Sequence, residues 1–264
     1  MTNQPRVAVL LDCDNVSWQR ASAVIAEAAT HGVLGVKRGY GDWGSPHLSR
    51  WRQQLVPLAI QPVQQIAYVA GKGATDMALV IDAMDLLYSG QVDTFCLVAS
   101  DSDYTRLAMR LREAGKRVIG IGAKHTPAAF SSACDRFTFV EVLGAAPVLA
   151  EPDELMTGSI GGLEEPEPSG DSAAQPATTP TAGQAPDLDE MLNSALAACQ
   201  GDDGWALLSN VGFQLVSNHP TFDSRNYGYA RLGQLVRDQP NLEIREVPGA
   251  NGNSVLHLRV REVQ

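Results

Sequence analysis

The chain of 264 residues lacks the segments that mark exported or membrane-spanning proteins. No apolar stretch approaches the roughly 20 residues that a helix needs to cross a bilayer. The first residues, MTNQPR, lead into an apolar run without a signal-peptide core or a small-residue cleavage site. We therefore expect a cytoplasmic protein with no membrane contact.

Cysteine pairs and histidine clusters are also missing. The four cysteines are Cys13, Cys96, Cys134 and Cys199, and no two of them form a CxxC pair. Their wide spacing favours neither a disulfide framework nor a zinc site, so we expect reduced and mostly buried thiols. The five histidines are scattered, and we assign none of them as a catalytic base.

Basic residues are absent from one long stretch. Residues 147–190 carry no Lys or Arg and 10 Asp or Glu, whereas residues 1–146 carry 14 basic and 13 acidic side chains and residues 191–264 carry 6 and 7. The middle stretch therefore accounts for the net charge of −10. A cation bound by several acids of the first part would leave the rest of that part basic, so the acidic total argues only weakly against a nucleic-acid partner.

The same region has the composition of a linker. Residues 147–187 are rich in Pro, Gly, Ala, Thr and Glu, contain no aromatic residue and show no apolar period. Such a composition cannot bury enough surface to offset the entropy of ordering, so we expect a disordered acidic linker. An ordered lid loop is the alternative, but loops beyond about 12–15 residues are uncommon in compact domains. We therefore predict two domains, residues 1–146 and residues 188–264.

The first of these domains alternates between strand-like and helix-like segments. Strands are expected at Val7–Leu11, Val33–Tyr40, Ile60–Gln65, Thr94–Ala99, Arg117–Ile121 and Phe137–Val142. Helices are expected at 17–31, 45–56, Asp76–Ser89, Tyr104–Ala114 and 127–133, with Ser17, Ser45 and Thr75 as N-caps. This succession predicts an α/β fold in which helices flank a parallel sheet.

Aspartates gather at the edge of the expected sheet where such folds bind ligands. Asp12 ends the first strand in LLDCDN, Asp76 opens a helix in GKGATD, and Asp101 and Asp103 follow the central strand in VASDSDY. The carboxyl ends of parallel strands converge on one crevice. Carboxylates gathered there repel one another unless a cation lies between them, and hard oxygen ligands suit Mg²⁺ or Mn²⁺. The pattern predicts a metal-dependent phosphodiester hydrolase, with Asp12 as a metal ligand.

Several members of this group also have a structural interpretation. Asn15 either orients a ligand or caps the following helix, and the two interpretations are equally favoured. Asp76 could interact only with the dipole of its helix, an effect of about 0.3–1 kcal/mol. One of Asp101 and Asp103 is expected to be an N-cap, but two carboxylates in that turn exceed what capping needs.

Three basic residues, Lys72, Arg38 and Arg106, are expected to border the crevice, where they could contact phosphate. A single Lys or Arg is, however, more often a solvated surface group. Asp82 and Asp85 lie further along the Asp76 helix, and we interpret them as structural or surface groups.

The blocks LLDCDN, KGATDMALVIDAMDLL and FCLVASDSDYTRLAMRLREAGKRVIGIG resemble the signature blocks of the NYN domain, a branch of the PIN-like ribonucleases. The resemblance spans about residues 5–142 and keeps the order and spacing of the blocks. It implies a PIN-like α/β fold, dependence on Mg²⁺ or Mn²⁺, and cleavage of RNA. It assigns metal binding to Asp12, Asp76, Asp101 and Asp103, with Asn15 in support.

The second domain is expected to form helices at 188–199, 205–218 and 229–237, followed by strands at 242–247 and 255–261. Helices followed by a Gly- and Asn-rich hairpin predict a small α+β winged-helix domain, which is long enough for its own core. The blocks DGWALL and FDSRNYG, with the helix after them, resemble the OST-HTH/LOTUS domain over about residues 189–261. That resemblance implies binding of RNA or docking of a protein partner.

Cationic and aromatic residues cluster at the start of the third helix of this domain, at Arg225, Tyr227, Tyr229 and Arg231. They are groups of the kind that bind single-stranded RNA, through phosphates and base stacking. In the alternative, the tyrosines belong to the core and the arginines are solvated.

Together these patterns predict a metal-dependent ribonuclease, cutting inside or at the end of a chain, with a C-terminal module that selects RNA or a protein partner. A catalytically inactive RNA-binding adaptor is the alternative. A phosphatase or another phosphotransferase on a doubly wound fold would also use such aspartates.

Overall fold

The computed structural model describes residues 4–65, 74–144, 187–201, 203–248 and 254–261. Nearly all of the expected linker lies outside the described residues, and so does Lys72. No helix in the described ranges is long and apolar enough to cross a membrane.

A six-stranded parallel sheet forms the centre of the first domain, with the order β3-β2-β1-β4-β5-β6. Its strands are β1 (Arg6–Asp12), β2 (Val33–Gly41), β3 (Gln61–Gln64), β4 (Thr94–Val98), β5 (Arg117–Gly122) and β6 (Arg136–Phe139). Consecutive side chains of β1 and β4 point to opposite faces of the sheet and are all buried, apart from Arg6. The parallel α/β fold expected from the sequence is confirmed.

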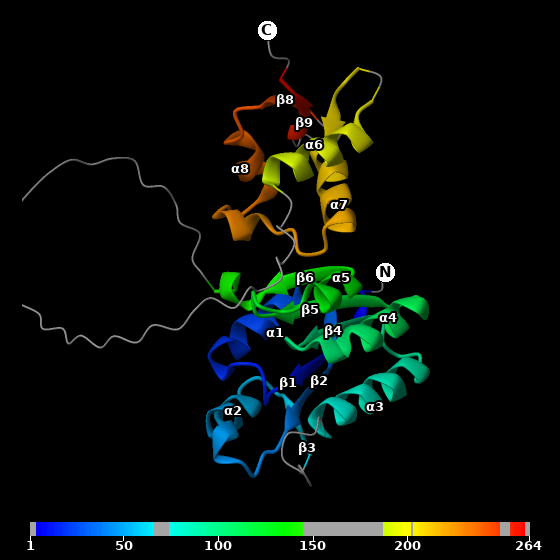
Figure 1. Cartoon of the computed structure of the whole chain (residues 1–264), viewed down its shortest axis with the longest axis vertical. Coiled ribbons are helices and arrows are strands. Elements are labelled where there is room, and N and C mark those ends of the chain that lie inside the picture. Colours follow the sequence, from blue (N-terminus) through cyan, green and yellow to red (C-terminus); the bar gives the residue numbers. More distant parts are fainter. Residues whose placement is uncertain (1–3, 66–73, 145–186, 202, 249–253, 262–264) are drawn as a thin grey trace, which may run out of the picture.

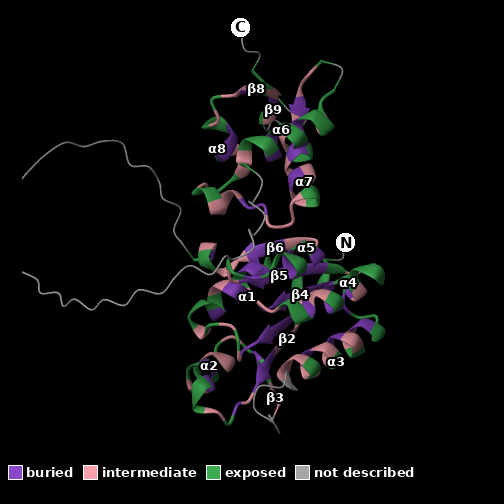
Figure 2. Ribbon diagram, viewed as in Figure 1, coloured by how far each residue is buried: buried purple, intermediate pink, exposed green. Residues whose placement is uncertain are grey.

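Helices cover both faces of this sheet (Figures 1 and 2). They are α1 (Ala21–Ala29), α2 (Ser49–Leu55), α3 (Ala74–Tyr88), α4 (Thr105–Glu113) and α5 (Ala128–Ala133), with 3₁₀ turns η1 (Trp18–Arg20), η2 (Pro46–Leu48), η3 (Ser102–Tyr104) and η4 (Val140–Val142). One core lies against α3, α4 and α5, through Leu79, Leu107 and Phe130. The other lies against α1 and α2, through Val24 and Trp51. The sheet is thus buried on both sides, and only its edges are open to ligands.

The helix starts show where local signals are sufficient and where they are not. Ser17 and Ser45 accept hydrogen bonds as N-caps of the 3₁₀ turns η1 and η2, as expected. Thr75 is not an N-cap: it lies inside α3, and its hydroxyl donates to Asp14 Oδ2 at 2.7 Å. A cap bonds within its own helix, whereas this threonine joins α3 to the end of β1.

The C-terminal domain is a small helical unit with a hairpin. It contains α6 (Leu188–Cys199), β7 (Ala206–Leu207), α7 (Leu208–Asn218), η5 (Ser224–Tyr227), α8 (Leu232–Arg237), β8 (Leu242–Pro248) and β9 (Ser254–Val260). The strands form an antiparallel sheet in the order β7-β9-β8. Leu196, Leu215 and Leu258 meet in its core. This arrangement confirms the winged-helix α+β prediction.

Two expected helices of this domain are shorter than predicted. The segment after Gly204 begins as strand β7, because Ala206 pairs with Leu258 of β9, and α7 starts only at Leu208. The helix expected at 229–237 starts at Leu232, because Gly228 has a left-handed φ of 86° and ends η5. Both differences come from turn geometry and long-range pairing.

The two domains touch along the β6 edge of the first domain (Figure 1). The backbone N–H of Phe137 donates to the carbonyl of Pro220 at 2.7 Å. Arg225 forms two hydrogen bonds with the carboxylate of Glu27 on α1, at 3.0 and 3.1 Å. Arg136 of β6 contacts Asp223 at 3.1 Å. These contacts place the C-terminal domain away from the carboxyl ends of β1 and β4.

Candidate active site

The strand order reverses direction between β1 and β4, which lie side by side at the centre of the sheet. In open α/β sheets, ligands bind at such a switch point, outside the carboxyl ends of the strands. Asp12 is the last residue of β1, and Asp101 comes shortly after the end of β4. The topology therefore brings two of the expected site residues to this edge.

Asp12 is a fully buried carboxylate. The Asn15 side-chain amide donates to its Oδ2 at 3.0 Å, and the Asn15 backbone N–H donates to its Oδ1 at 3.3 Å. Burial, together with the negative charge of Asp76, raises the pKa of Asp12 to about 6, despite the hydrogen bonds from Asn15 and Tyr104, which lower it. Asn15 thus orients the carboxylate of Asp12.

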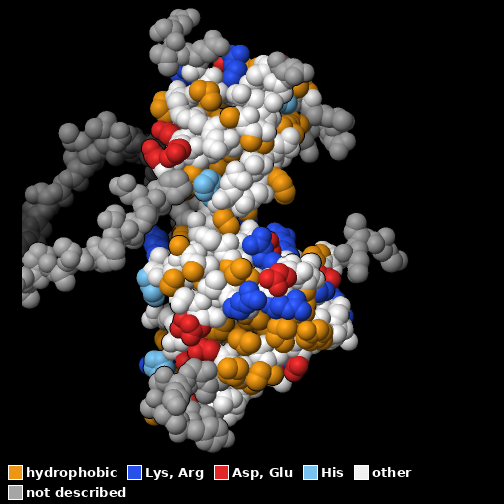
Figure 3. All heavy atoms as spheres, turned by 45° about the vertical axis from the view of Figure 1, so that its right-hand side comes forward, with side chains coloured by type: hydrophobic (Ala, Val, Ile, Leu, Met, Phe, Trp, Pro, Cys, Tyr) orange, Lys and Arg blue, Asp and Glu red, His pale blue; other side chains and the backbone are white. Residues whose placement is uncertain are grey.

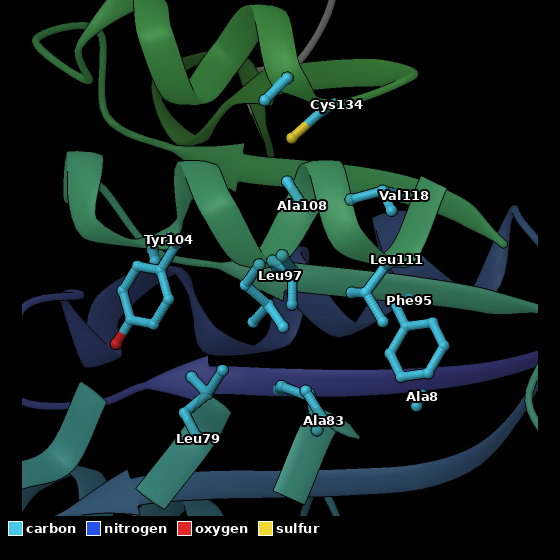
Figure 4. Packing of buried hydrophobic residues seen from close by; sticks show 14 of the residues in the cluster. Ala8, Leu79, Ala83, Phe95, Leu97, Tyr104, Ala108, Leu111, Val118 and Cys134 are labelled. Carbon is cyan, nitrogen blue, oxygen red and sulfur yellow. The ribbon is translucent and has the colours of Figure 1, made fainter. Parts of the chain in front are cut away.

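Tyr104 connects the first and second aspartates of the site. Its hydroxyl lies 2.6 Å from Asp76 Oδ1 and 3.2 Å from Asp12 Oδ2. Figure 4 shows the ring beside the core and the hydroxyl pointing away from the other labelled side chains. Burial and the two carboxylates hold the pKa of Tyr104 well above its ordinary value, so the phenol stays protonated. One proton is therefore shared between two acidic groups.

Asp14 and Thr75 hold the start of α3 against the end of β1. The Thr75 hydroxyl donates to Asp14 Oδ2 at 2.7 Å, and Asp76 is the next residue in the chain. This bond fixes the first turn of α3, so Asp76 faces the crevice as the sequence suggested. Asp76 also accepts a hydrogen bond from the Tyr104 hydroxyl, which a carboxylate that interacts only with the helix dipole would not need.

Asp101 and Asp103 play separate parts in the turn after β4. Asp101 caps η3: its Oδ1 accepts from the Asp103 N–H at 3.0 Å and lies 3.4 Å from the Ser102 hydroxyl. Asp103 is exposed in the first turn of η3. One of the pair is thus an N-cap, as expected.

The residues fit a divalent cation by charge and donor type. Neither Asp12 nor Asp76 forms an ion pair with a described Lys, Arg or His. The carboxylates of Asp12 and Asp76 share one hydrogen-bond donor, Tyr104, and the pKa of Asp12 is raised. A bound cation would reduce the repulsion between them. No group of three His, Cys, Asp or Glu side chains able to hold a metal occurs among the described residues. The assembled part is therefore a two-carboxylate core.

Arg38 does not point freely at the crevice. It forms an ion pair with Asp82 at 3.0 Å, and the Tyr40 hydroxyl donates to the same carboxylate oxygen at 2.9 Å. This triad connects β2 to α3, so the structure gives Arg38 and Asp82 structural partners.

The structure places the four residues expected to bind RNA in different surroundings. Arg225 is half-buried between Glu27 and Asp223 and belongs to the domain interface. Tyr229 packs against the core, whereas Tyr227 is 36% exposed, with its ring 6.0 Å from that of Phe222. Arg231 is exposed at the N-cap position of α8. Only Tyr227 and Arg231 remain open to a ligand.

Sequence reasoning did not single out Tyr104, Thr75 or Asp14 as functional partners. The signal for Tyr104 was its place after the two aspartates of SDSDY, at the first turn of a helix. Nothing local shows that its hydroxyl reaches Asp12 and Asp76, because these contacts span 92 and 28 residues.

Solved structures resemble parts of the chain. A protein of unknown function from Vibrio parahaemolyticus is 18% identical, with 53% of this chain and 94% of that chain covered and a TM-score of 0.43. An uncharacterized protein from Nitrosomonas europaea is 33% identical, with coverage of 36% and 91% and a TM-score of 0.27. A protein from Chromobacterium violaceum is 35% identical, with coverage of 31% and 88% and a TM-score of 0.27. The search of curated proteins finds no match.

Family models identify both domains. The NYN domain model matches residues 6–142, more than half of the chain. The matched range contains Asp12, Asp76, Asp101 and Asp103. The OST-HTH/LOTUS domain model matches residues 183–254. The chain therefore belongs to the NYN domain family, within the PIN-like nuclease superfamily, and carries an OST-HTH/LOTUS domain in its C-terminal part.

Proposed function

We propose that this protein is a metal-dependent ribonuclease that hydrolyses phosphodiester bonds of single-stranded RNA. The observation that carries the proposal is the pair of carboxylates, Asp12 and Asp76, bridged by Tyr104 at the switch point of a NYN-domain sheet. A site of this kind needs a cation to bring an RNA phosphate close, because carboxylates and phosphates repel each other.

Asp12 and Asp76 would hold Mg²⁺ or Mn²⁺, and Asp101 and Asp103 would complete the ligand set from the turn after β4. A divalent cation held there supplies Lewis acidity, which lowers the pKa of a bound water and stabilises the leaving oxygen. Asn15 keeps Asp12 oriented through its amide. Tyr104 bridges the two carboxylates and donates its hydroxyl to Asp76 Oδ1.

The C-terminal domain would select the RNA or a protein partner. Tyr227 and Arg231 are its exposed groups for stacking and phosphate contact, and we retain them as proposed RNA-binding residues. Arg225 and Arg38 are engaged with carboxylates, so we assign them no direct RNA contact. Lys72 stays a proposed phosphate ligand on the sequence argument alone.

A catalytically inactive RNA-binding adaptor is the second candidate function. One observation favours it: the described residues contain no group of three metal-ligating side chains. An adaptor would bind RNA equally well with and without a divalent cation, whereas a nuclease would cut only with one.

The test is incubation of the purified full-length chain with labelled single-stranded RNA in Mn²⁺, in Mg²⁺ and in EDTA. The proposal expects cleavage with a metal and none in EDTA, and it expects Asp12→Asn or Asp101→Asn to abolish cleavage without unfolding the protein. Binding without cleavage in every buffer would favour the adaptor. Cleavage at the wild-type rate by both variants would overturn the site assignment.

A further inference from the structure

A cleft of about 950 Å³ lies between the two domains. One wall comes from the end of α4 and the start of β5, and the other comes from α7 and the turn after it. Arg117 is the first residue of β5, whereas the candidate site around Asp12 lies beyond the carboxyl ends of the parallel strands. The cleft is therefore separate from the site built around Asp12.

The wall contributed by the first domain is basic. It contains Arg112, Lys116 and Arg117, against a single carboxylate, Asp135. Arg112 Nε pairs with Asp135 Oδ1 at 2.8 Å, while Asp135 Oδ2 accepts the backbone N–H of Val118. In the described parts of the chain, no carboxylate pairs with the side chain of Lys116 or Arg117. Figure 3 shows Lys and Arg side chains gathered on the first domain beneath the C-terminal domain.

The opposite wall carries an exposed aromatic ring. Phe213 of α7 lines the cleft together with Val216 and Ser217, which lie on the same face of the helix. The Phe213 side chain is 75% exposed, although it is a large apolar group. A phenylalanine exposed to water is unfavourable for the free protein, and its ring provides a flat surface on which a base can stack.

We propose that this cleft binds single-stranded RNA, with Lys116 and Arg117 on the phosphates and Phe213 stacked on a base. A cationic groove with an aromatic platform is the chemistry that single-stranded nucleic acids require. This inference rests on the proposed function for its choice of RNA. The cleft would hold a part of the strand that lies away from the scissile phosphate.

The domain contacts keep the two walls at a fixed separation. Arg225 joins Glu27 of the first domain to Asp223 of the second, and Phe137 binds Pro220 through the backbone. Pro220 itself lines the cleft. The platform and the cations therefore face each other before RNA arrives, which lowers the entropic cost of binding.

The test measures binding by fluorescence anisotropy in EDTA, with the full-length chain and a labelled unstructured RNA of about 16 nucleotides. The double variant Lys116→Ala/Arg117→Ala should weaken binding and lower the steepness of log K against log salt by about 1.4, the value for two lost phosphate contacts. Phe213→Leu should weaken binding about five- to a hundredfold, and Phe213→Tyr should retain it. Arg237→Ala, which removes one exposed positive charge at the end of α8 and outside the cleft, is the control for a general loss of positive charge.

Thermal unfolding of each variant shows that it is folded. Wild-type affinity and salt dependence in both cleft variants, or equal losses in Arg237→Ala, would overturn the inference, as would no binding by the wild type at low salt. Metal-dependent cleavage measured separately distinguishes the two claims. If RNA is cut normally but the cleft variants bind it as tightly as the wild type does, only the proposal about the cleft is contradicted. Binding through the cleft without any cleavage contradicts the nuclease alone.

Discussion

Tyr104 donates one proton at a place where two carboxylates compete for it. Its hydroxyl is closer to Asp76 than to Asp12, and Asn15 holds the Asp12 carboxylate in position. Burial keeps the pKa of Asp12 raised, at about 6. An ionised Asp12 in the metal-free protein is therefore a source of instability. The same property suits a site whose charge is completed by a cation.

The first prediction concerns the stability of the metal-free protein. The folded pKa of Asp12 lies above its unfolded value of 3.8, so the folded state binds the proton more tightly and loses stability as the pH rises from about 4 to about 6. Asp12→Asn removes this term. We expect the variant to gain roughly 1–3 kcal/mol over the wild type above pH 6, and less below pH 4, in denaturant unfolding with EDTA. A difference between the two proteins that does not vary with pH would contradict this.

The second prediction concerns the hydroxyl of Tyr104. Tyr104→Phe removes a hydrogen bond that lowers the pKa of Asp12, so this pKa should rise further. The buried carboxylates also lose their donor, at a cost of about 1–3 kcal/mol. The acidic limb of the cleavage profile should therefore move to higher pH. Tyr88→Phe is the control, because Tyr88 is 74% exposed; an unmoved profile in Tyr104→Phe would show that the hydroxyl has no electrostatic role.

At the scale of elements, α3 is fastened to the sheet at two points. Thr75 bonds to Asp14 after β1, and Asp82 binds both Arg38 and Tyr40 of β2. The first contact fixes the turn that carries Asp76, and the second fixes the helix about two turns further on. The position of Asp76 thus depends on residues outside the aspartate motifs.

The third prediction tests this attachment. Asp82→Ala leaves the buried Tyr40 hydroxyl and the half-buried Arg38 without their common acceptor, which should cost about 1–3 kcal/mol of unfolding free energy. Asp85→Ala on the exposed side of α3 should cost little. We would measure both by urea unfolding; equal stabilities would show that the triad does not fasten α3.

Elements whose signals are local could be predicted from the sequence. The apolar runs that become β1 and β4, and the caps Ser17 and Ser45, were sufficient to place the main strands and helix starts. The short strand β7 was not predictable, because it forms by pairing with β9. The ring centroid of Trp205, the residue before β7, lies 4.4 Å from the guanidinium carbon of Arg245 and 4.8 Å from that of Arg259. The aspartates of the site were predictable for the same reason as the strands, but the Tyr104 bridge depends on long-range contacts.

At the scale of the whole molecule, two arginines, Arg225 and Arg136, form ion pairs between the domains. Arg225 lies between Glu27, which is 8% exposed, and Asp223, which is 5% exposed. Burial would raise the pKa of Asp223, but the hydrogen bonds and charge of Arg225 outweigh it and hold this pKa below its ordinary value. The contribution of Asp223 is therefore present at neutral pH and is lost as the pH falls below about 4.

The fourth prediction concerns the independence of the domains. We propose that residues 1–146 and 188–264 each fold alone and that residues 147–187 form the linker. A chain ending at residue 146 should stay folded and keep any cleavage activity, with a lower melting temperature because Glu27 loses Arg225. Arg225→Ala in the full chain should expand the molecule in small-angle scattering. Unfolding on truncation at 146 would contradict the division into two domains.

The most direct test of the central claim is cleavage of labelled single-stranded RNA in Mn²⁺ by three full-length proteins. They are the wild type, Asp76→Asn and Asp85→Asn, two variants that carry the same chemical change on one helix, at the proposed site and on its exposed face. If Asp12 and Asp76 hold the cation, the wild type and Asp85→Asn cut at similar rates, EDTA stops both, and Asp76→Asn does not cut. Cleavage by Asp76→Asn at the wild-type rate, or cleavage that persists in EDTA, would contradict the account.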